Sequence, residues 1–145
     1  MLLAAAYAGL AIENSMLGAA HSMANPLTAR YGIVHGQAVA TALPHVVRFN
    51  AEDPAAARVY AQLARSVALA PESASEPEAA ARLAAGLQDL LNRAGLPVSL
   101  AGSGVPASAA PELASSASEQ WTARFNPRSV SEDDFRSLFA TACVP

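Results

Sequence analysis

Two histidines, His21 and His35, are the residues of this sequence whose type and spacing best suit chemistry. Neutral imidazole is the commonest protein ligand for zinc and iron, with its ring nitrogen about 2.0–2.1 Å from the metal. His35 follows His21 by fourteen positions, which on one straight helix would separate the two backbones by roughly 21 Å at a rise of ~1.5 Å per residue, too far to share an ion. The chain must therefore turn between the two histidines if they act together.

Asn25-Pro26 lies between the histidines and is the expected place for that turn. Proline removes a backbone donor, clashes with the preceding turn of a helix and biases the residue before it away from helical angles. We therefore expect a helix that carries His21 to end near Pro26, and a second helix to start near His35.

Two imidazoles form half of a usual metal site, and the sequence offers no obvious third ligand. His45 follows His35 by ten residues, which on a helix turns it about 80° away, so a surface or packing role is expected for it. On spacing alone, His21 and His35 could equally be two partly buried, hydrogen-bonded histidines that bind no metal.

The composition predicts an all-α protein of one domain. About a quarter of the residues are alanine, a strong helix former, and aromatic residues make up only 6% of the chain. Apolar spacing and capping residues predict a bundle of about five to seven helices. The expected helices are Leu2–Met23 (one long buried helix), Gly36–Phe49 (with a kink or local break at Pro44), Asp53–Leu69, Ser75–Gly95, a weaker Ala107–Gln120, and a last helix that opens at Ser131 and buries Phe135, Leu138 and Phe139.

Charge and cysteine content argue against several classes of function. The net charge of −3 and the lack of a dense basic patch give nucleic-acid binding little support. The apolar opening segment is interrupted by Glu13 and Asn14 before ~20 apolar residues accumulate, so we expect no membrane span. The single cysteine, Cys143, suits a reducing cytoplasm.

The sequence around the histidines closely resembles the helical domain of the iron-containing (group III) alcohol dehydrogenases. The resemblance covers essentially the whole chain and is most specific in the first fifty residues. It is carried by Ala8-Gly9, Asn14, Leu17-Gly18, His21, Ala24, Pro26-Leu27, Tyr31, His35-Gly36, Leu43-Pro44-His45-Val46 and Arg48-Phe49-Asn50, and later by Gly95-Leu96-Pro97, Ser99-Leu100 and Asn126-Pro127-Arg128.

This resemblance implies a fold like the helical domain of the dehydroquinate synthase-like enzymes, and a metal-dependent oxidoreductase. In the iron-containing alcohol dehydrogenases an aspartate and three histidines hold divalent iron, or sometimes zinc. His21 and His35 match the last two of these histidines. The other two ligands, and most of the site for NAD or NADP, would belong to an amino-terminal domain that this sequence lacks. We therefore expect residues 1–145 to be one metal-binding domain that handles a small alcohol or aldehyde only with that half, and to be inactive alone.

One position departs from the family's pattern. Four residues after the first of these two ligands the family often has another histidine, and here that position is Asn25. Asparagine can donate and accept hydrogen bonds but cannot shuttle a proton near neutral pH. Asn25 is therefore a candidate catalytic position at which proton handling would differ, and an Asn25→His substitution in a full-length enzyme is expected to alter the pH dependence of turnover.

Two other functions remain open at this point. Maleylacetate reductases share the helical layout, so a reductase of that kind is one alternative. The other is a catalytically silent helical module that assembles with a partner through its apolar first helix, since large apolar surfaces mark interfaces. Whichever function applies, the expected protein partner is a second copy of the chain, in a homo-oligomer, or the amino-terminal half.

Overall fold

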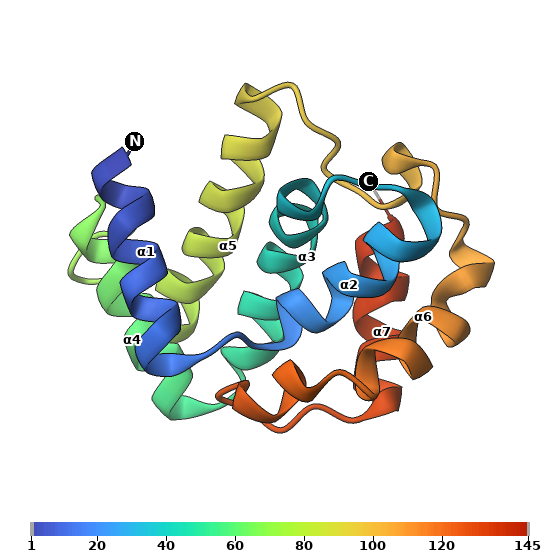
Figure 1. Cartoon of the computed structure of the whole chain (residues 1–145). Coiled ribbons are helices and arrows are strands. Elements are labelled where there is room, and N and C mark those ends of the chain that lie inside the picture. The colour runs from blue at the N-terminus through green and yellow to red at the C-terminus, as the bar shows by residue number, and fades with distance from the viewer. Residues whose placement is uncertain (1, 145) are drawn as a thin grey trace.

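The computed structural model describes residues 2–144, and within them every regular element is a helix, as predicted (Figure 1). Short 3₁₀ turns occur at Ala101–Ser103 (η1), Ala107–Ala109 (η2) and Trp121–Phe125 (η3). The α-helices are α1 (Leu2–Ser15), α2 (Ala19–Tyr31), α3 (His35–Asn50), α4 (Pro54–Ser66), α5 (Glu76–Arg93), α6 (Ala110–Ser118) and α7 (Glu132–Cys143).

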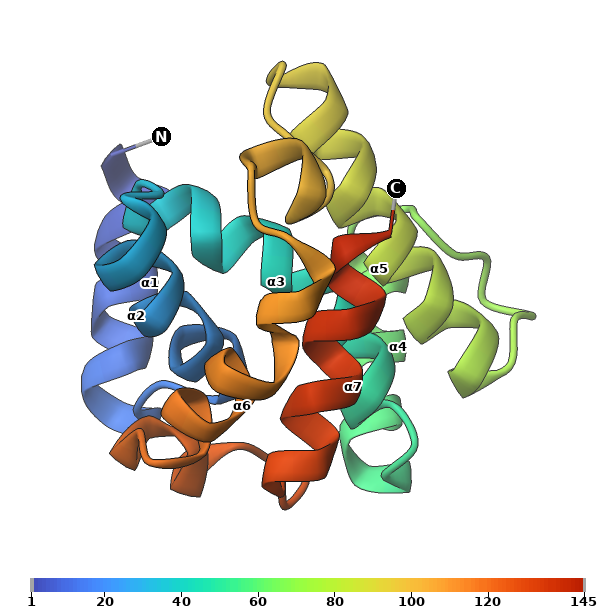
Figure 2. The ribbon, with the colours of Figure 1, turned by 90° about the vertical axis from the view of Figure 1, so that its right-hand side faces the viewer.

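The main core lies between α2, α3, α6 and α7, which Figure 2 shows packed side by side. Its largest fully buried side chains include Phe135, Phe139, Met23 and Leu27. Small alanines fill most of the remaining positions, which lets the helices approach closely. A second, smaller cluster of alanines joins α4 to α5.

Capping residues set several helix ends as the sequence predicts. The Asp53 side chain accepts hydrogen bonds from the first backbone N–H groups of α4, and Ser75 and Ser131 each form a capping box, at the starts of α5 and α7. Gly95 follows α5 with a positive φ of 67°, the conformation that glycine adopts at the end of a helix. Helix α4 stops at Ser66 rather than at Leu69, because Ala68 takes a left-handed conformation.

The prediction of one long buried helix from Leu2 to Met23 is wrong. The chain breaks at residues 16–18, where Met16 has a φ of +64°, and α1 and α2 meet at a bend of 108°. No residue of α1 is buried. Because α1 is apolar on all sides, its sequence alone selects no face for packing.

The predicted corner at Asn25-Pro26 is also wrong, since α2 continues through Pro26 to Tyr31. A proline inside a helix costs one backbone hydrogen bond, and here its ring is buried against the core. The chain turns instead at Gly32, whose φ of 65° ends α2 and whose N–H donates to the Thr28 carbonyl at 3.1 Å. Helix α3 likewise runs without a break through Pro44.

No single helix among the described residues has both the length and the apolar character to cross a membrane. Helices α1 and α2 reach those values only when taken together, across their bend.

Candidate metal centre

The turn at Gly32 brings the two predicted ligands together. His21 lies in the first turn of α2 and His35 is the first residue of α3. Their ring centroids are 5.4 Å apart, and the planes are tilted by 48°. The corner differs from the predicted one, but the expected meeting of the two imidazoles is present.

This spacing fits two imidazoles that share one ion. With each ring nitrogen about 2.0–2.1 Å from a tetrahedral metal, the two ring centroids lie roughly 5 Å apart. The separation of 5.4 Å is close to that value, and the tilt of the rings differs from parallel stacking. The pair can therefore supply two ligands to a divalent cation, and neutral imidazole suits both iron and zinc.

The pair alone does not make a complete site. Within residues 2–144, no group of three or more histidine, cysteine or acidic side chains is placed to hold a metal ion. Structural and catalytic zinc sites use three or four protein ligands. A site of this kind therefore needs at least one ligand beyond the two imidazoles.

His21 borders a large hollow in the surface of the protein. This hollow of about 610 Å³ lies between the α1–α2 junction, α3, α4 and the segment around Asn126, and His21 is part of its wall. His35 is exposed, whereas His21 is only partly so. Neither ring is sealed from solvent, so both can be approached by an ion.

The surroundings of His21 favour the neutral form of its imidazole. Burial lowers the pKa of His21 below its usual 6.5, and the positive charge that His35 can carry lowers this pKa further. Metal ligation requires the neutral form of imidazole. His21 therefore stays competent as a ligand at a lower pH than a free histidine would.

Asn25 lies one turn beyond His21 and its amide is engaged in a hydrogen bond. Its Nδ2 donates to Oε1 of Gln120 at 2.8 Å. Of the other residues near the histidines, Ser22, Met23 and Leu27 are all fully buried. Met23 and Leu27 belong to the main hydrophobic core, and the Ser22 hydroxyl shares a hydrogen bond of 2.7 Å with that of Thr122.

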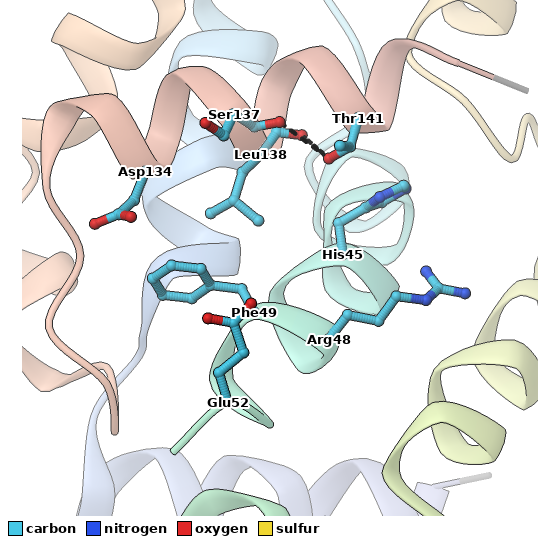
Figure 3. Close-up of a pocket in the computed structure, with 8 residues that line it drawn as sticks. All are labelled: His45, Arg48, Phe49, Glu52, Asp134, Ser137, Leu138 and Thr141. Atoms are coloured by element: carbon cyan, nitrogen blue, oxygen red, sulfur yellow. Dashed lines mark hydrogen bonds between the residues drawn. The ribbon is translucent and has the colours of Figure 1, made fainter. Parts of the chain in front are cut away.

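His45 lines a different cavity, of about 230 Å³, between α3 and α7 (Figure 3). Figure 3 shows His45 and Arg48 projecting from α3, with Asp134 and Thr141 on α7. The Nε2 atom of His45 is buried and has no hydrogen-bond partner among the described residues. His45 is partly buried between the two helices, which agrees with the surface or packing role expected of it.

Several side chains that hydrogen-bond to α2 could not be predicted from the sequence. Gln120, Thr122 and Asn126 all bond to α2, although they lie about a hundred positions further along the chain. Neither a motif nor a periodic pattern connects residues at that separation.

Comparison with known proteins points to one family of enzymes. The model of the Fe-containing alcohol dehydrogenase family, C-terminal, matches residues 1–143. Lactaldehyde reductase of Escherichia coli is 35% identical over 135 residues, which are 93% of this chain and 35% of that enzyme. The 1,3-propanediol dehydrogenase of Klebsiella pneumoniae is 32% identical over 142 residues, covering 98% of this chain and 36% of that enzyme.

A solved structure shows the same fold. The alcohol dehydrogenase from Oenococcus oeni superposes with a TM-score of 0.85 at 29% identity, over 93% of this chain and 35% of that one. The chain thus spans about a third of the length of the curated relatives it matches. The matching family model and the shared helical fold lead to one conclusion: this chain belongs to the Fe-containing alcohol dehydrogenase family, in the C-terminal region of that family's fold.

Proposed function

We propose that this chain supplies two ligands, His21 and His35, to a divalent metal site in an NAD(P)-linked oxidoreductase that interconverts small alcohols and aldehydes. The observation that carries the proposal is the approach of the two rings to 5.4 Å from separate helices. The relatives support the substrate class, since their names specify a lactaldehyde and a propanediol.

The rest of the site is proposed to lie in the part of the relatives that this chain does not cover. That part is about two thirds of their length. By resemblance to the family, it would contribute an aspartate, a further histidine and most of the nicotinamide dinucleotide site. The metal would be iron or zinc, and the cytoplasm is the proposed location.

When bound, the cation supplies electrostatic stabilisation of the charge that develops on the substrate oxygen during hydride transfer. The chain's own contribution is to present two neutral imidazoles at a fixed spacing beside an open hollow. Asn25 remains a candidate for altered proton handling. The hydrogen bond of Asn25 to Gln120 supports a structural role instead. The pH dependence of turnover in a full-length Asn25→His enzyme would distinguish the two roles.

Metal titration of the whole chain tests the proposal, with Zn²⁺ and Fe²⁺ followed by calorimetry under anaerobic conditions. We expect weak binding of one ion, since two ligands are present, and loss of that binding in both His21→Ala and His35→Ala. His45→Ala is the matched control, because it removes the third histidine, which lines a different cavity.

Two results would count against the proposal. Binding that survives both substitutions would place the ion elsewhere, and an absence of binding in the unmodified chain would favour a catalytically silent module. For that alternative, the exposed apolar side chains of α1, such as Leu3 and Tyr7, would be the interacting surface. Conversely, NAD-dependent alcohol oxidation by the isolated chain would show that no further ligands are needed.

A further inference from the structure

The segment Gln120–Asn126, which includes η3 and is called the strap below, runs against α2. In Figure 1 it lies at the bottom of the molecule, in dark orange, beneath the start of α2. Asn126 reaches the beginning of this helix, where its Oδ1 accepts a hydrogen bond from the backbone N–H of Ala19 at 3.2 Å. This contact replaces a local cap, because Gly18 has no side chain to provide one.

Two more strap residues bond to the same helix. The hydroxyl groups of Thr122 and Ser22 share a hydrogen bond of 2.7 Å, and both residues are almost fully buried. Gln120 accepts from the Asn25 amide at 2.8 Å. The strap therefore holds α2 through polar contacts along two turns.

The three contacts lie on one side of α2, where they oppose rotation and sliding of the helix. Ala19, Ser22 and Asn25 are three residues apart, and residues at this spacing are neighbours on one side of a helix. Turning α2 about its own axis, or sliding it along, would break all of these directional bonds together. His21 lies among them, so the strap fixes the direction in which this imidazole points.

Asn126 also reaches the helix that carries the second histidine. Its amide exchanges two hydrogen bonds with the amide of Asn50, at 2.7 and 3.2 Å, and Asn50 is the last residue of α3. The start of α2 is thereby joined to the end of α3, while the Gly32 turn joins the opposite ends of the two helices. A second connection of this kind fixes the angle between two helices that a single corner would leave free to change.

We infer that the strap is the positioning element of the histidine pair: Gln120, Thr122 and Asn126 hold α2 and α3 so that His21 and His35 stay close enough to share an ion. This inference rests on the proposed metal function. Strap residues do not themselves coordinate the metal in this account. They act as outer partners do at other metal sites, where loss of one typically weakens binding 10–100-fold.

The sharpest test compares Thr122→Val with Thr122→Ser. Valine has nearly the shape of threonine but no hydroxyl, so it removes the bond to Ser22, whereas serine retains the hydroxyl. We expect Zn²⁺ affinity to fall on the order of tenfold in Thr122→Val and to be restored in Thr122→Ser. Thr41→Val is the matched control, because Thr41 is equally buried but bonds to the Pro97 carbonyl, away from the strap.

A second readout needs no metal. Magnetisation transfer between the ring protons of His21 and His35, measured by NMR on histidine-labelled protein, reports whether the rings remain close. It should weaken in Thr122→Val and stay unchanged in Thr41→Val. If Thr122→Val does not fold, as judged from its circular dichroism, Gln120→Ala replaces it, since Gln120 is less buried.

The Zn²⁺ affinity tests the metal function, and the magnetisation transfer between the rings tests the positioning by the strap. If the unmodified chain binds no Zn²⁺, the metal function fails, and the ring contacts still decide whether the strap positions the pair. If affinity and ring contacts in a folded strap variant equal those of the Thr41→Val control, the strap merely stabilises the fold and the inference is overturned.

Discussion

Replacing Gly18 with alanine would test how tightly the first turn of α2 is held. A Cβ atom at this position would lie 3.0 Å from Oδ1 of Asn126, closer than a methyl group and an oxygen normally approach. The backbone of Gly18 is extended, with φ −128° and ψ −157°, so alanine itself would not be strained there. Any cost must therefore come from displacing the Asn126 side chain.

The size of this cost follows from what Asn126 Oδ1 accepts. It takes hydrogen bonds of 3.2 Å from Ala19 N–H and from Asn50 Nδ2, and each such bond contributes about 0.5–1.5 kcal/mol. Losing both would cost about 1–3 kcal/mol, against a gain of about 0.4–1 kcal/mol because alanine restricts the unfolded chain more than glycine does. We expect Gly18→Ala to destabilise the protein by about 1–2 kcal/mol.

Urea unfolding followed by circular dichroism measures this change. Gly36→Ala is the control, since a Cβ atom there would meet nothing within 4 Å, and it should not destabilise. In an Asn126→Ala background the clash disappears, so Gly18→Ala should then cost nothing. If Gly18→Ala costs the same with and without the Asn126 side chain, our account of this contact is refuted.

Three further predictions concern the core, a helix cap and pH. Phe139→Ala removes a fully buried side chain and should cost about 3–5 kcal/mol in urea unfolding, whereas Phe125→Ala, at a residue that is 49% exposed, should cost much less. Ser131→Ala removes the cap of α7 and should lower the free energy of unfolding by about 1 kcal/mol, and a stability equal to that of the parent would contradict the capping role. Burial, and then the charge of Arg48, lowers the pKa of His45 below 6.5, so the unfolded chain takes up a proton first as pH falls and stability should decrease below that pH. A His45→Gln variant should show a smaller decrease, and an unchanged pH dependence would exclude His45 as its source.

Local signals account for the parts of the fold that were predicted correctly. Asp53 and Ser131 indicate where helices start, because their side chains accept hydrogen bonds from backbone N–H groups two or three residues away. The buried face of Phe135, Leu138 and Phe139 follows from their spacing alone. Such interactions are contained in a few consecutive residues, so the sequence displays them directly.

The errors arose where tertiary packing outweighs local preference. Pro26 normally ends a helix, but here its buried ring is accommodated and Gly32 forms the corner two turns later. The apolar run from Leu2 gave no reason to expect a break, because the bonds that start α2 come from Asn126. The pairing of His21 and His35 is nevertheless predictable from the sequence, since it requires a turn somewhere between them and not at a particular residue.

Anomalous X-ray diffraction tests most directly whether His21 and His35 bind one divalent ion together, as we propose. Crystals of the chain soaked in Zn²⁺ would be measured on both sides of the zinc absorption edge. We predict an anomalous difference peak between the two rings, about 2.0–2.1 Å from a nitrogen of each. A peak at His45 instead, or rings that stay together with no zinc between them, would contradict the claim.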